Sequence, residues 1–347
     1  MTSPRNVGSA YVLLHHVLGE AAGRQGVWAY VEGGMGSISN SIARAASEAG
    51  AELVTGCAVE EIVLDDNGKA IGVRVDDGGL IRARQAVVSN LSPFQTMVQL
   101  LSDPAAQQAG EEAKGEKKGL SAYCKHIRGA DYTCGSFKIN CALDKLPSFS
   151  CLPNHRDGRP GPQHRGTIHF ENDREEIERA CMEASRGVPA TRPVIEMTIP
   201  SSLDTTVAPP GQHVAQLFVQ FAPYDVDPAL GIGWEDPTFK EDFVNRVFSI
   251  VDEFAPGFQD SIVGVDALSP LDLERVFGLH KGNIFHGALG LNQIGWARPA
   301  VGWSSHRTPV DSVYLCGAGN HPGGGVSGAP GRNCAAVLLS DMGLAIK

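Results

Sequence analysis

The sequence predicts a mixed α/β protein that contains an α+β region, and three stretches carry this prediction. Residues 313–342 read as a buried strand, a glycine-rich loop and a helix. Residues 59–88 alternate apolar and polar side chains around tight turns, which is typical of a β-meander. Between about residues 94 and 300, strand candidates are separated by amphipathic helices, as expected of an α+β domain.

The overall composition excludes several classes of protein. The 347 residues are 42% hydrophobic and 20% charged, which is enough apolar material for a sizeable core. The formal net charge of -10 disfavours nucleic-acid binding, because an acidic surface repels phosphates. No run of about 18 apolar residues is present, so no membrane-spanning helix is expected, whereas peripheral membrane contact stays open.

Cysteine and histidine spacing argues against redox-thiol and metal chemistry. The eight cysteines are scattered, and no pair has C-x-x-C or C-x4-C spacing, so we expect reduced thiols and no dithiol relay. The eleven histidines show no H-E-x-x-H spacing, and adjacent His15 and His16 would point to opposite faces of a strand. No metal site is therefore expected.

A helix is expected directly after Gly33–Gly36. Ser37 or Ser39 is the expected N-cap, and Gly50 is placed where a left-handed C-cap belongs. Small and aliphatic residues recur on one face of this segment at helical spacing. Such a face predicts close packing against a sheet.

Strands and further helices follow from the hydrophobic pattern. Strands are expected at 51–54, 59–64, 71–75, 80–84, 85–88, 137–143, 194–199, 213–221 and 313–316. Helices are expected at 175–185, 240–254 and 329–342. Residues 104–119 are polar and read as a solvated helix or loop, and residues 154–166 read as a surface loop.

The segment Gly317–Gly328 points most directly to a ligand. Its glycines let the backbone approach a flat or charged group, and the following helix offers N–H groups and a partial positive charge. Gly323–Gly328 formally matches G-x-G-x-x-G, but an ADP-binding βαβ unit needs a second strand and an acidic residue about 20 positions later. The sequence ends at Lys347, so this stretch is not expected to be that fingerprint. The alternative is a simple strand-to-helix connection.

A family resemblance rests on the stretches YVEGGMGSISNSIARAASEAGAEL, AVVSN and YLCGAGNHPGGGVSGAPGRNCAAVLL. Together with KINCALDKLPSF, RPVIEMTIPSSLDTTVAPPGQHV and LERVFGLHKGNIFHGALGLNQ, they resemble the phytoene-desaturase branch of FAD-dependent amine-oxidase-type enzymes. The resemblance covers nearly the whole sequence. It implies an incomplete FAD-binding domain of the amine-oxidase/phytoene-desaturase type with an inserted α+β substrate domain.

The same resemblance implies how the sequence divides. Residues 1–30 would be a remnant of the substrate domain, 31–93 the middle segment of the FAD-binding domain, 94–300 the substrate domain, and 301–347 the last segment of the FAD-binding domain. The family's N-terminal strand–GxGxxG–helix unit, with its ribose-binding acidic residue, has no counterpart in the sequence. We therefore expect a truncated chain.

FAD is the cofactor that the resemblance implies, and it assigns contact positions. Val59 is similar to the residue whose backbone meets the adenine, while Ser89 and Asn90 fall at the strand end that lines the nucleotide cleft. From the residues alone, Val59 as strand core and Ser89-Asn90 as a turn stay open. The positions that match the loop touching the pyrophosphate, ribityl chain and isoalloxazine ring are Gly317, Ala318, His321, Pro322, Gly323, Gly324, Gly325 and Val326.

Some roles are left undecided by the sequence. His321 reads as a satisfied loop histidine rather than a base, and Gly33–Gly36 is either a helix-entry turn or a wall beside the flavin. No residue is assigned as a catalytic acid or base. Glu196, His169 and His286 fall in stretches that read as strands, and each is expected to be structural.

The implied activity is hydride transfer from a C–H bond of an unidentified substrate to flavin. Polyenes, other lipids and amines all stay open as substrates, and an apolar substrate would need an apolar tunnel. The alternative is a non-catalytic regulator of mitochondrial function that acts through a protein partner. A nicotinamide-dependent dehydrogenase is disfavoured, because no complete Rossmann fingerprint is present. An animal-like relative implies the mitochondrial matrix, and a bacterial one the cytoplasm.

Overall fold

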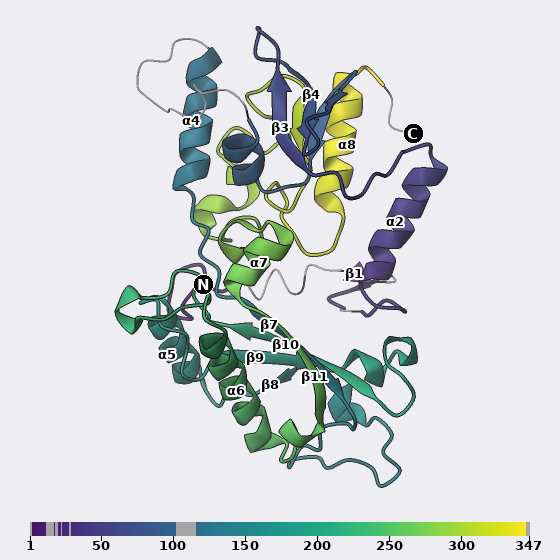
Figure 1. Ribbon diagram of the computed structural model, residues 1–347, viewed down its shortest axis with the longest axis vertical. Coiled ribbons are helices and arrows are strands. Elements are labelled where there is room, and N and C mark those ends of the chain that lie inside the picture. Colours follow the sequence, from purple (N-terminus) through teal and green to yellow (C-terminus); the bar gives the residue numbers. More distant parts are fainter. Residues whose placement is uncertain are drawn as a thin grey trace. The chain divides into compact units, whose positions relative to one another are not determined.

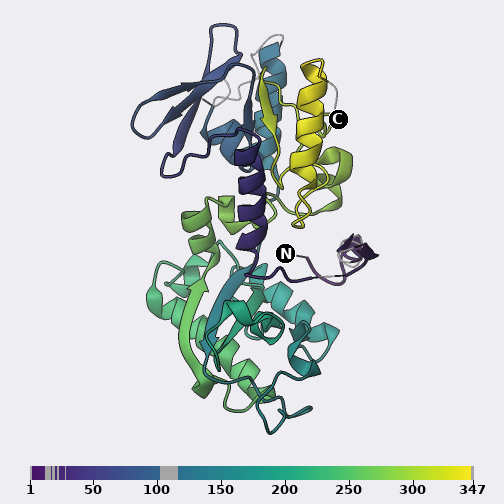
Figure 2. The same cartoon turned by 90° about the vertical axis from the view of Figure 1, so that its right-hand side faces the viewer.

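Two compact units make up the protein, whose structure is a computed structural model (Figures 1 and 2). It describes residues 2–11, 17, 20–21, 23–27, 29–101 and 116–344. The first unit comprises residues 1–53 and 133–283, and the second comprises residues 54–132 and 284–347. Helices and strands occur in both, which agrees with the predicted mixed α/β class. The four segments that the family resemblance implies have different boundaries from these two units, and that division stays a prediction.

The first unit is built on a five-stranded antiparallel sheet in the order β11-β7-β10-β9-β8. The strands predicted at 137–143, 194–199 and 213–221 are confirmed, within one residue at their ends. The sequence did not reveal β8, which has two residues, or β11, whose residues are mostly exposed. The bounds are β7 (Phe137–Leu143), β8 (Ile168–His169), β9 (Val194–Thr198), β10 (His213–Gln220) and β11 (Ile262–Leu268).

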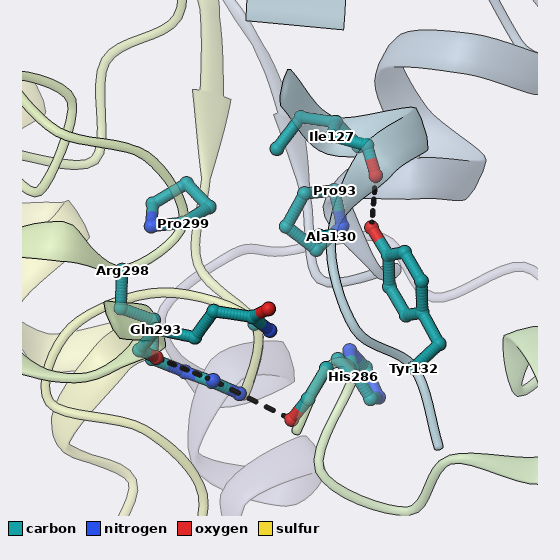
Figure 3. A pocket seen from close by; sticks show the side chains of 10 residues that line it. Pro93, Ile127, Ala130, Tyr132, His286, Gln293, Arg298 and Pro299 are labelled. Atoms are coloured by element: carbon teal, nitrogen blue, oxygen red, sulfur yellow. Dashed lines mark hydrogen bonds between the residues drawn. The ribbon is translucent and has the colours of Figure 1, made fainter. Parts of the chain in front are cut away.

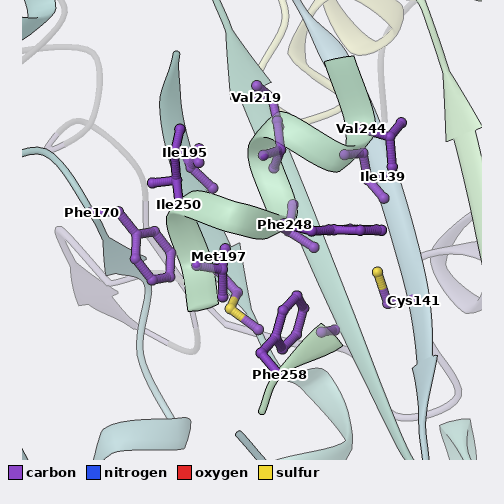
Figure 4. Close-up of a cluster of buried hydrophobic side chains, with 14 of the residues drawn as sticks. Ile139, Cys141, Phe170, Ile195, Met197, Val219, Val244, Phe248, Ile250 and Phe258 are labelled. Atoms are coloured by element: carbon purple, nitrogen blue, oxygen red, sulfur yellow. The ribbon is translucent and has the colours of Figure 1, made fainter. Parts of the chain in front are cut away.

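One face of this sheet packs against helix α6 (Pro237–Phe254) to form the main hydrophobic core (Figure 4). Alternate residues of β7 are buried, as the two-residue period of a strand requires. Phe137, Phe243 and Phe258 are among its largest fully buried side chains. Burial of each such ring stabilises the fold by about 1.5–3 kcal/mol.

Helix starts in the first unit follow ordinary capping rules. The Asp236 side chain accepts a hydrogen bond from the Thr238 N–H at 2.8 Å, and Pro237 occupies the first helical position of α6. Ser269 and Asp272 form a capping box at α7. The other elements of this unit are α5 (Arg174–Ala184), α7 (Pro270–Phe277), β1 (Glu20–Ala21), β2 (Arg24–Gln25) and the short helices η2 (Pro162–His164), η3 (Pro200–Ser202), η4 (Thr205–Val207), η5 (Pro228–Leu230), η6 (Gln259–Ser261) and η7 (His280–Gly282).

Helix α2 (Gly36–Glu48) confirms the predicted helix but corrects two details. Its N-cap is Met35, whose backbone is already helical, so neither predicted serine lies in the extended position from which a side chain caps the first turn. Gly50 has a φ of +92°, which confirms the left-handed C-cap. None of the helix's side chains is buried, and Ile42 is 63% exposed, so the predicted close packing against a sheet is wrong for the described residues.

The strand predicted at 51–54 is also wrong. Leu53 and Val54 have large exposed fractions, and no described strand pairs with this segment. An extended segment becomes a strand only when a neighbour satisfies its N–H and C=O groups. Two other predictions, the opposite orientation of His15 and His16 and the solvated segment 104–115, lie outside the described residues.

The second unit contains the predicted β-meander and a parallel strand pair. The meander runs β3 (Val59–Leu64), β4 (Ala70–Val75) and β5 (Leu80–Arg82), antiparallel throughout. Strand β6 (Val87–Ser89) pairs in parallel with β12 (Val313–Leu315), which brings two distant parts of the chain together. Its other elements are η1 (Gln95–Gln99), a π-helical turn, α4 (Glu116–Gly129), η8 (Leu291–Gln293), η9 (Gly295–Ala297) and α8 (Ala329–Asp341).

A smaller core holds the second unit together. Ile62, Met97 and Leu101 pack with Ile127 of α4 and Val313 of β12. Within the described ranges, no helix is long and apolar enough to cross a membrane. The same residues contain no cluster of three or more side chains that could hold a metal ion.

Candidate functional site

The parallel pair β6–β12 brings two predicted contact regions together. Leu315 pairs with Ser89, and the Cys316 N–H donates to the Ser89 carbonyl at 2.8 Å. One residue later the two chains are so close that a Cβ on Gly317 would lie 2.2 Å from the Asn90 carbonyl oxygen. Only glycine fits there. Thus Ser89, Asn90 and Gly317 lie side by side, although they are far apart in the sequence.

Beyond Gly317 the chain forms a tight, partly buried loop. Asn320 is fully buried, and its backbone N–H donates to the Gly317 carbonyl at 3.1 Å. A Cβ on Gly319 would lie 2.2 Å from Pro93 Cδ, so a second glycine is required by close approach. The Asn320 carbonyl accepts from the Gly323 N–H at 2.7 Å. The first half of the loop is therefore fixed against the end of β6.

The second half of the loop is largely exposed and leads into α8, although Gly323 is buried and Gly324 is half-buried. His321, Pro322 and Gly325 are exposed, and Val326 is 70% exposed with a φ of +57°. Gly328 adopts the left-handed conformation and is the N-cap of α8 without a side-chain hydrogen bond. The strand–loop–helix unit that the sequence predicted is confirmed, with the start of α8 directly after the exposed glycines.

A groove of about 730 Å³ runs along the meander and β6. Val59, Ser89 and Asn90, predicted from distant motifs, all line it. Val59 is 40% exposed, so it belongs to the groove wall rather than to the strand core. The Ser89 hydroxyl lies 2.8 Å from the Thr96 hydroxyl and accepts from the Leu91 N–H, so it also stabilises the turn. The other lining residues are Ile62, Gly72, Val73, Ile81, Arg82, Ala83, Ala86, Val87, Val88, Leu91, Gln95, Gln99 and Leu100.

A second, much smaller cavity lies beside the loop (Figure 3). Its volume is about 10 Å³, room for roughly one water molecule. Gln293 lines it and binds the Asp131 backbone twice, accepting from its N–H at 2.7 Å and donating to its carbonyl at 3.0 Å. The Tyr132 hydroxyl donates to the Ile127 carbonyl at 2.9 Å. Gly319 also lines this cavity, so it adjoins the glycine loop.

Arg298 and His286 give this cavity its electrostatic character. Arg298 is 2% exposed, and its Nε and Nη2 donate to the Ala318 carbonyl at 3.1 and 2.9 Å. Burial lowers the pKa of His286, and the nearby Arg298 charge lowers it further. Its Nδ1 is buried without a hydrogen-bond partner among the described residues. Burial likewise raises the pKa of Tyr132, an effect that the Arg298 charge opposes.

Comparison with known proteins shows which family the chain resembles. The profile described as "Flavin containing amine oxidoreductase" matches residues 6–112. The chain is 43% identical to the Mus musculus protein named "Pyridine nucleotide-disulfide oxidoreductase domain-containing protein 2", over 99% of this chain and 56% of the mouse protein. It is 26% identical to "Phytoene desaturase (lycopene-forming)" of Pseudescherichia vulneris, over 98% of this chain and 61% of that protein. Over nearly its whole length the chain is thus similar to members of the flavin amine oxidase/phytoene desaturase-like family.

A solved structure supports the fold of this chain. The oxidoreductase from Methanosarcina mazei superposes with a TM-score of 0.51 at 20% identity, over 90% of this chain and 55% of that one. The chain thus spans little more than half the length of the relatives it matches. This likeness concerns the fold alone.

The residues of this chain fit a bound flavin nucleotide. Gly317 and Gly319 remove the Cβ atoms that would keep backbone apart at the loop. The buried Oδ1 of Asn320 has no hydrogen-bond partner among the described residues, so it can accept from a ligand. The exposed residues before α8 and the groove beside β6 supply surfaces on both sides of the strand pair.

The remaining candidates play other parts. His169 Nδ1 lies 3.2 Å from Glu171, Glu196 is hydrogen-bonded to Gln220, and the Gly33 N–H donates to Asp204. His286 was expected in a strand but lies in a loop with a φ of +59°. The sequence reasoning missed Arg298, Gln293 and Tyr132. The signal available for Arg298 was an arginine within the otherwise uncharged stretch 282–305.

Proposed function

We propose that the protein is an FAD-dependent oxidoreductase and that this chain supplies the glycine-loop side of its flavin site. One observation carries the proposal: the end of β6 and the start of the glycine loop meet at Asn90 and Gly317, beside a groove lined by Val59. A groove of about 730 Å³ is within the usual range for cofactor sites.

Each part of the chain would have a separate task. Val59 would border the adenine, and the groove end at Ser89 and Asn90 would border the ribose. The backbone of Gly323–Val326 and the N-terminus of α8 would face the phosphates and the ring, because glycines allow a ligand to approach the backbone closely and the helix dipole attracts negative charge. When bound, the flavin supplies the hydride acceptor.

An apolar substrate is the class we propose. The bacterial relative named above is a phytoene desaturase, which by its name acts on a polyene. Desaturation of a hydrocarbon transfers a hydride from one carbon to the flavin and releases a proton from the neighbouring carbon, so a proton acceptor is still required, and the sequence assigns none. We also propose a location in the mitochondrial matrix, or in the cytoplasm if the source is bacterial. A protein partner is likewise a proposal.

Flavin binding by the purified chain tests this proposal. Protein purified with FAD present should retain FAD, measured by its visible absorbance and by fluorescence titration of the apoprotein. Val59→Asp should weaken FAD binding at least tenfold, because the adenine would desolvate the new carboxylate in the groove without pairing it. Val265→Asp is the matched control, since Val265 is also an exposed strand valine (48%) but lies in β11, in the other unit.

The outcomes separate three readings. Retained FAD that is lost in Val59→Asp and kept in Val265→Asp supports the proposal. Equal weakening in both variants would mean that the groove is not the adenosine site. A wild-type chain without affinity for FAD overturns the proposal for this chain and favours the alternative of a partner-binding regulator.

A further inference from the structure

Arg298 joins three segments of the second unit through one buried guanidinium. Besides its two hydrogen bonds to the Ala318 carbonyl, Nη1 donates to the Gln293 carbonyl at 3.1 Å. Nη1 also reaches the Gly287 and Ala288 carbonyls at 3.5 Å, and Nη2 donates to the Phe285 carbonyl. Figure 3 shows the side chain extending alongside Gln293 toward His286. The segments 285–288, 293 and 318 therefore depend on one side chain.

A buried guanidinium has a high desolvation cost, which its hydrogen bonds must offset. Arginine suits this position because its five donors lie in one plane and can reach several carbonyls at once. Lysine offers three donors on a single atom and could not span the same segments. The geometry thus requires the shape of arginine as well as its charge.

The hydrogen bonds to Ala318 fix the direction of the loop backbone. The C=O and N–H groups of a trans peptide point in opposite directions. Holding the Ala318 carbonyl toward Arg298 therefore turns the Gly319 N–H to the opposite side of the loop. Gly319 and Asn320 then follow with close backbone contacts that leave no room for adjustment.

The charge of Arg298 also reaches the neighbouring groups. A guanidinium stays protonated in proteins, so its positive charge is permanent. It acts on His286 and Tyr132, both of which line the cavity that adjoins Gly319. Any group bound against this loop would experience the same field, because a low-dielectric surrounding screens it weakly.

We propose that Arg298 is a positioning residue that sets the Gly317–Val326 loop for flavin and raises the reduction potential of the flavin bound there. This inference rests on the proposed function. Reduced flavin carries more negative charge than oxidised flavin, so a fixed positive charge stabilises the reduced form and raises the potential. Charge near the flavin ring is a recognised means of tuning its electronics.

Two substitutions separate the hydrogen bonds from the charge. Arg298→Gln removes both, and Arg298→Lys keeps the charge but loses most of the hydrogen bonds. Arg307→Gln is the matched control, because Arg307 is in the same unit and paired with Asp341 but is partly exposed. The wild-type chain and the three variants are loaded with FAD, and the dissociation constant, the reduction potential against a reference dye and the unfolding midpoint of the apoprotein are measured.

The expected pattern is specific. FAD affinity falls about tenfold in both Arg298 variants, as expected for the loss of hydrogen bonds from a charged group. In Arg298→Gln the ratio of reduced to oxidised flavin at a fixed potential falls about tenfold, which corresponds to about 30 mV for a two-electron couple. In Arg298→Lys and in Arg307→Gln the potential stays near that of the wild type.

Every other outcome of these measurements either supports the proposed role of Arg298 or overturns it. An unchanged potential in Arg298→Gln overturns it while the proposed function stands, whereas a wild-type chain that binds no FAD overturns both. If both Arg298 variants lose flavin, an unchanged apoprotein unfolding midpoint supports the positioning role. Loss of the folded state in both variants would assign Arg298 to stability alone and overturn the inference.

Discussion

The two units of the molecule are held in their folded structures by different interactions. In the first unit, β7, β9, β10 and β11, which have five to eight residues each, and helix α6 enclose the main apolar core, and side-chain packing decides the structure. In the second unit, β5, β6 and β12 have three residues each, apolar residues such as Val59 and Val88 are exposed, and one arginine holds three loop segments. The core-rich unit is a scaffold, whereas the loop-rich unit has the features of a binding site.

The largest effect is expected when the apolar core of the first unit is opened. Phe243→Ala removes a ring that is 2% exposed and packs against Phe137 and Trp234. The free energy of unfolding of this unit should fall by about 3–5 kcal/mol. Amide hydrogen exchange followed segment by segment measures the change. Protection should fall in β7 and β10.

The same measurement tests whether the comparison between the units is sound. Protection in β12 and β6 should change little in Phe243→Ala, because these strands belong to the other compact unit. An equal loss of protection in both units would show that they unfold as one, and the contrast drawn above would not hold.

A smaller loss is expected at the strand end of the second unit. Gly317→Ala would place a Cβ within 2.2 Å of the Asn90 carbonyl oxygen, so β6 and β12 must separate locally. This strain should cost about 1–3 kcal/mol. Reduced exchange protection of the Cys316 amide, which donates to the Ser89 carbonyl, is the expected signature.

Gly331 offers the matched control for that variant. It lies within α8, and a Cβ added there would meet no atom within 4 Å. Gly331→Ala should leave β12 unchanged and stabilise the helix by up to about 1 kcal/mol, since alanine has the higher helix propensity. If both glycine variants behave alike, the close approach at Asn90 does not constrain the loop.

The sequence predicted most of the first unit because its strands and helices carry clear periodicities. Alternation in β7 and β10 and the apolar stripe of α6 are local signals, and they match the structure within a few residues. Strand β11 was missed because its residues are largely exposed, so it has no alternation to detect. The wrong strand at 51–54 has the right residue types but no partner among the described residues, which a local pattern cannot show.

The candidate site was predicted where glycines mark it and where the family resemblance assigns Val59, Ser89 and Asn90, which line the groove. Two features can be recognised in the sequence because glycine suits them better than other residues. They are the close approach of the backbone at Gly317 and the left-handed backbone conformation of Gly328. Arg298 stands out only as an arginine in an otherwise uncharged stretch, and its partners cannot be predicted because they are backbone carbonyls, which every residue possesses. Contacts to the main chain are therefore the part of a site that a single sequence reveals least.

The smallest effect on stability is expected when a partly buried charge in the first unit is removed. This substitution should stabilise the protein, whereas the core and loop substitutions destabilise it. Lys138 lies in β7 on the face opposite the core, between Phe218 and Leu268 of the adjacent strands. Burial lowers the pKa of Lys138 to about 8, an effect that the nearby Cys141 thiol partly opposes. The charged form is thus disfavoured in the folded state, and Lys138→Met should raise the free energy of unfolding at pH 7 by about 1–2 kcal/mol.

The pH dependence gives this last prediction its test. Because the folded pKa is lower than the unfolded one, the unfolded chain binds more protons between about pH 8 and pH 10.5, and wild-type stability should rise across that window. The advantage of Lys138→Met should therefore shrink from pH 8 upward and vanish near pH 10.5, as measured by urea unfolding. Lys145→Met, at an exposed position, should differ from the wild type by less than about 0.5 kcal/mol throughout. A gain that persists at high pH would trace the effect to the added apolar contacts of methionine and not to the buried charge.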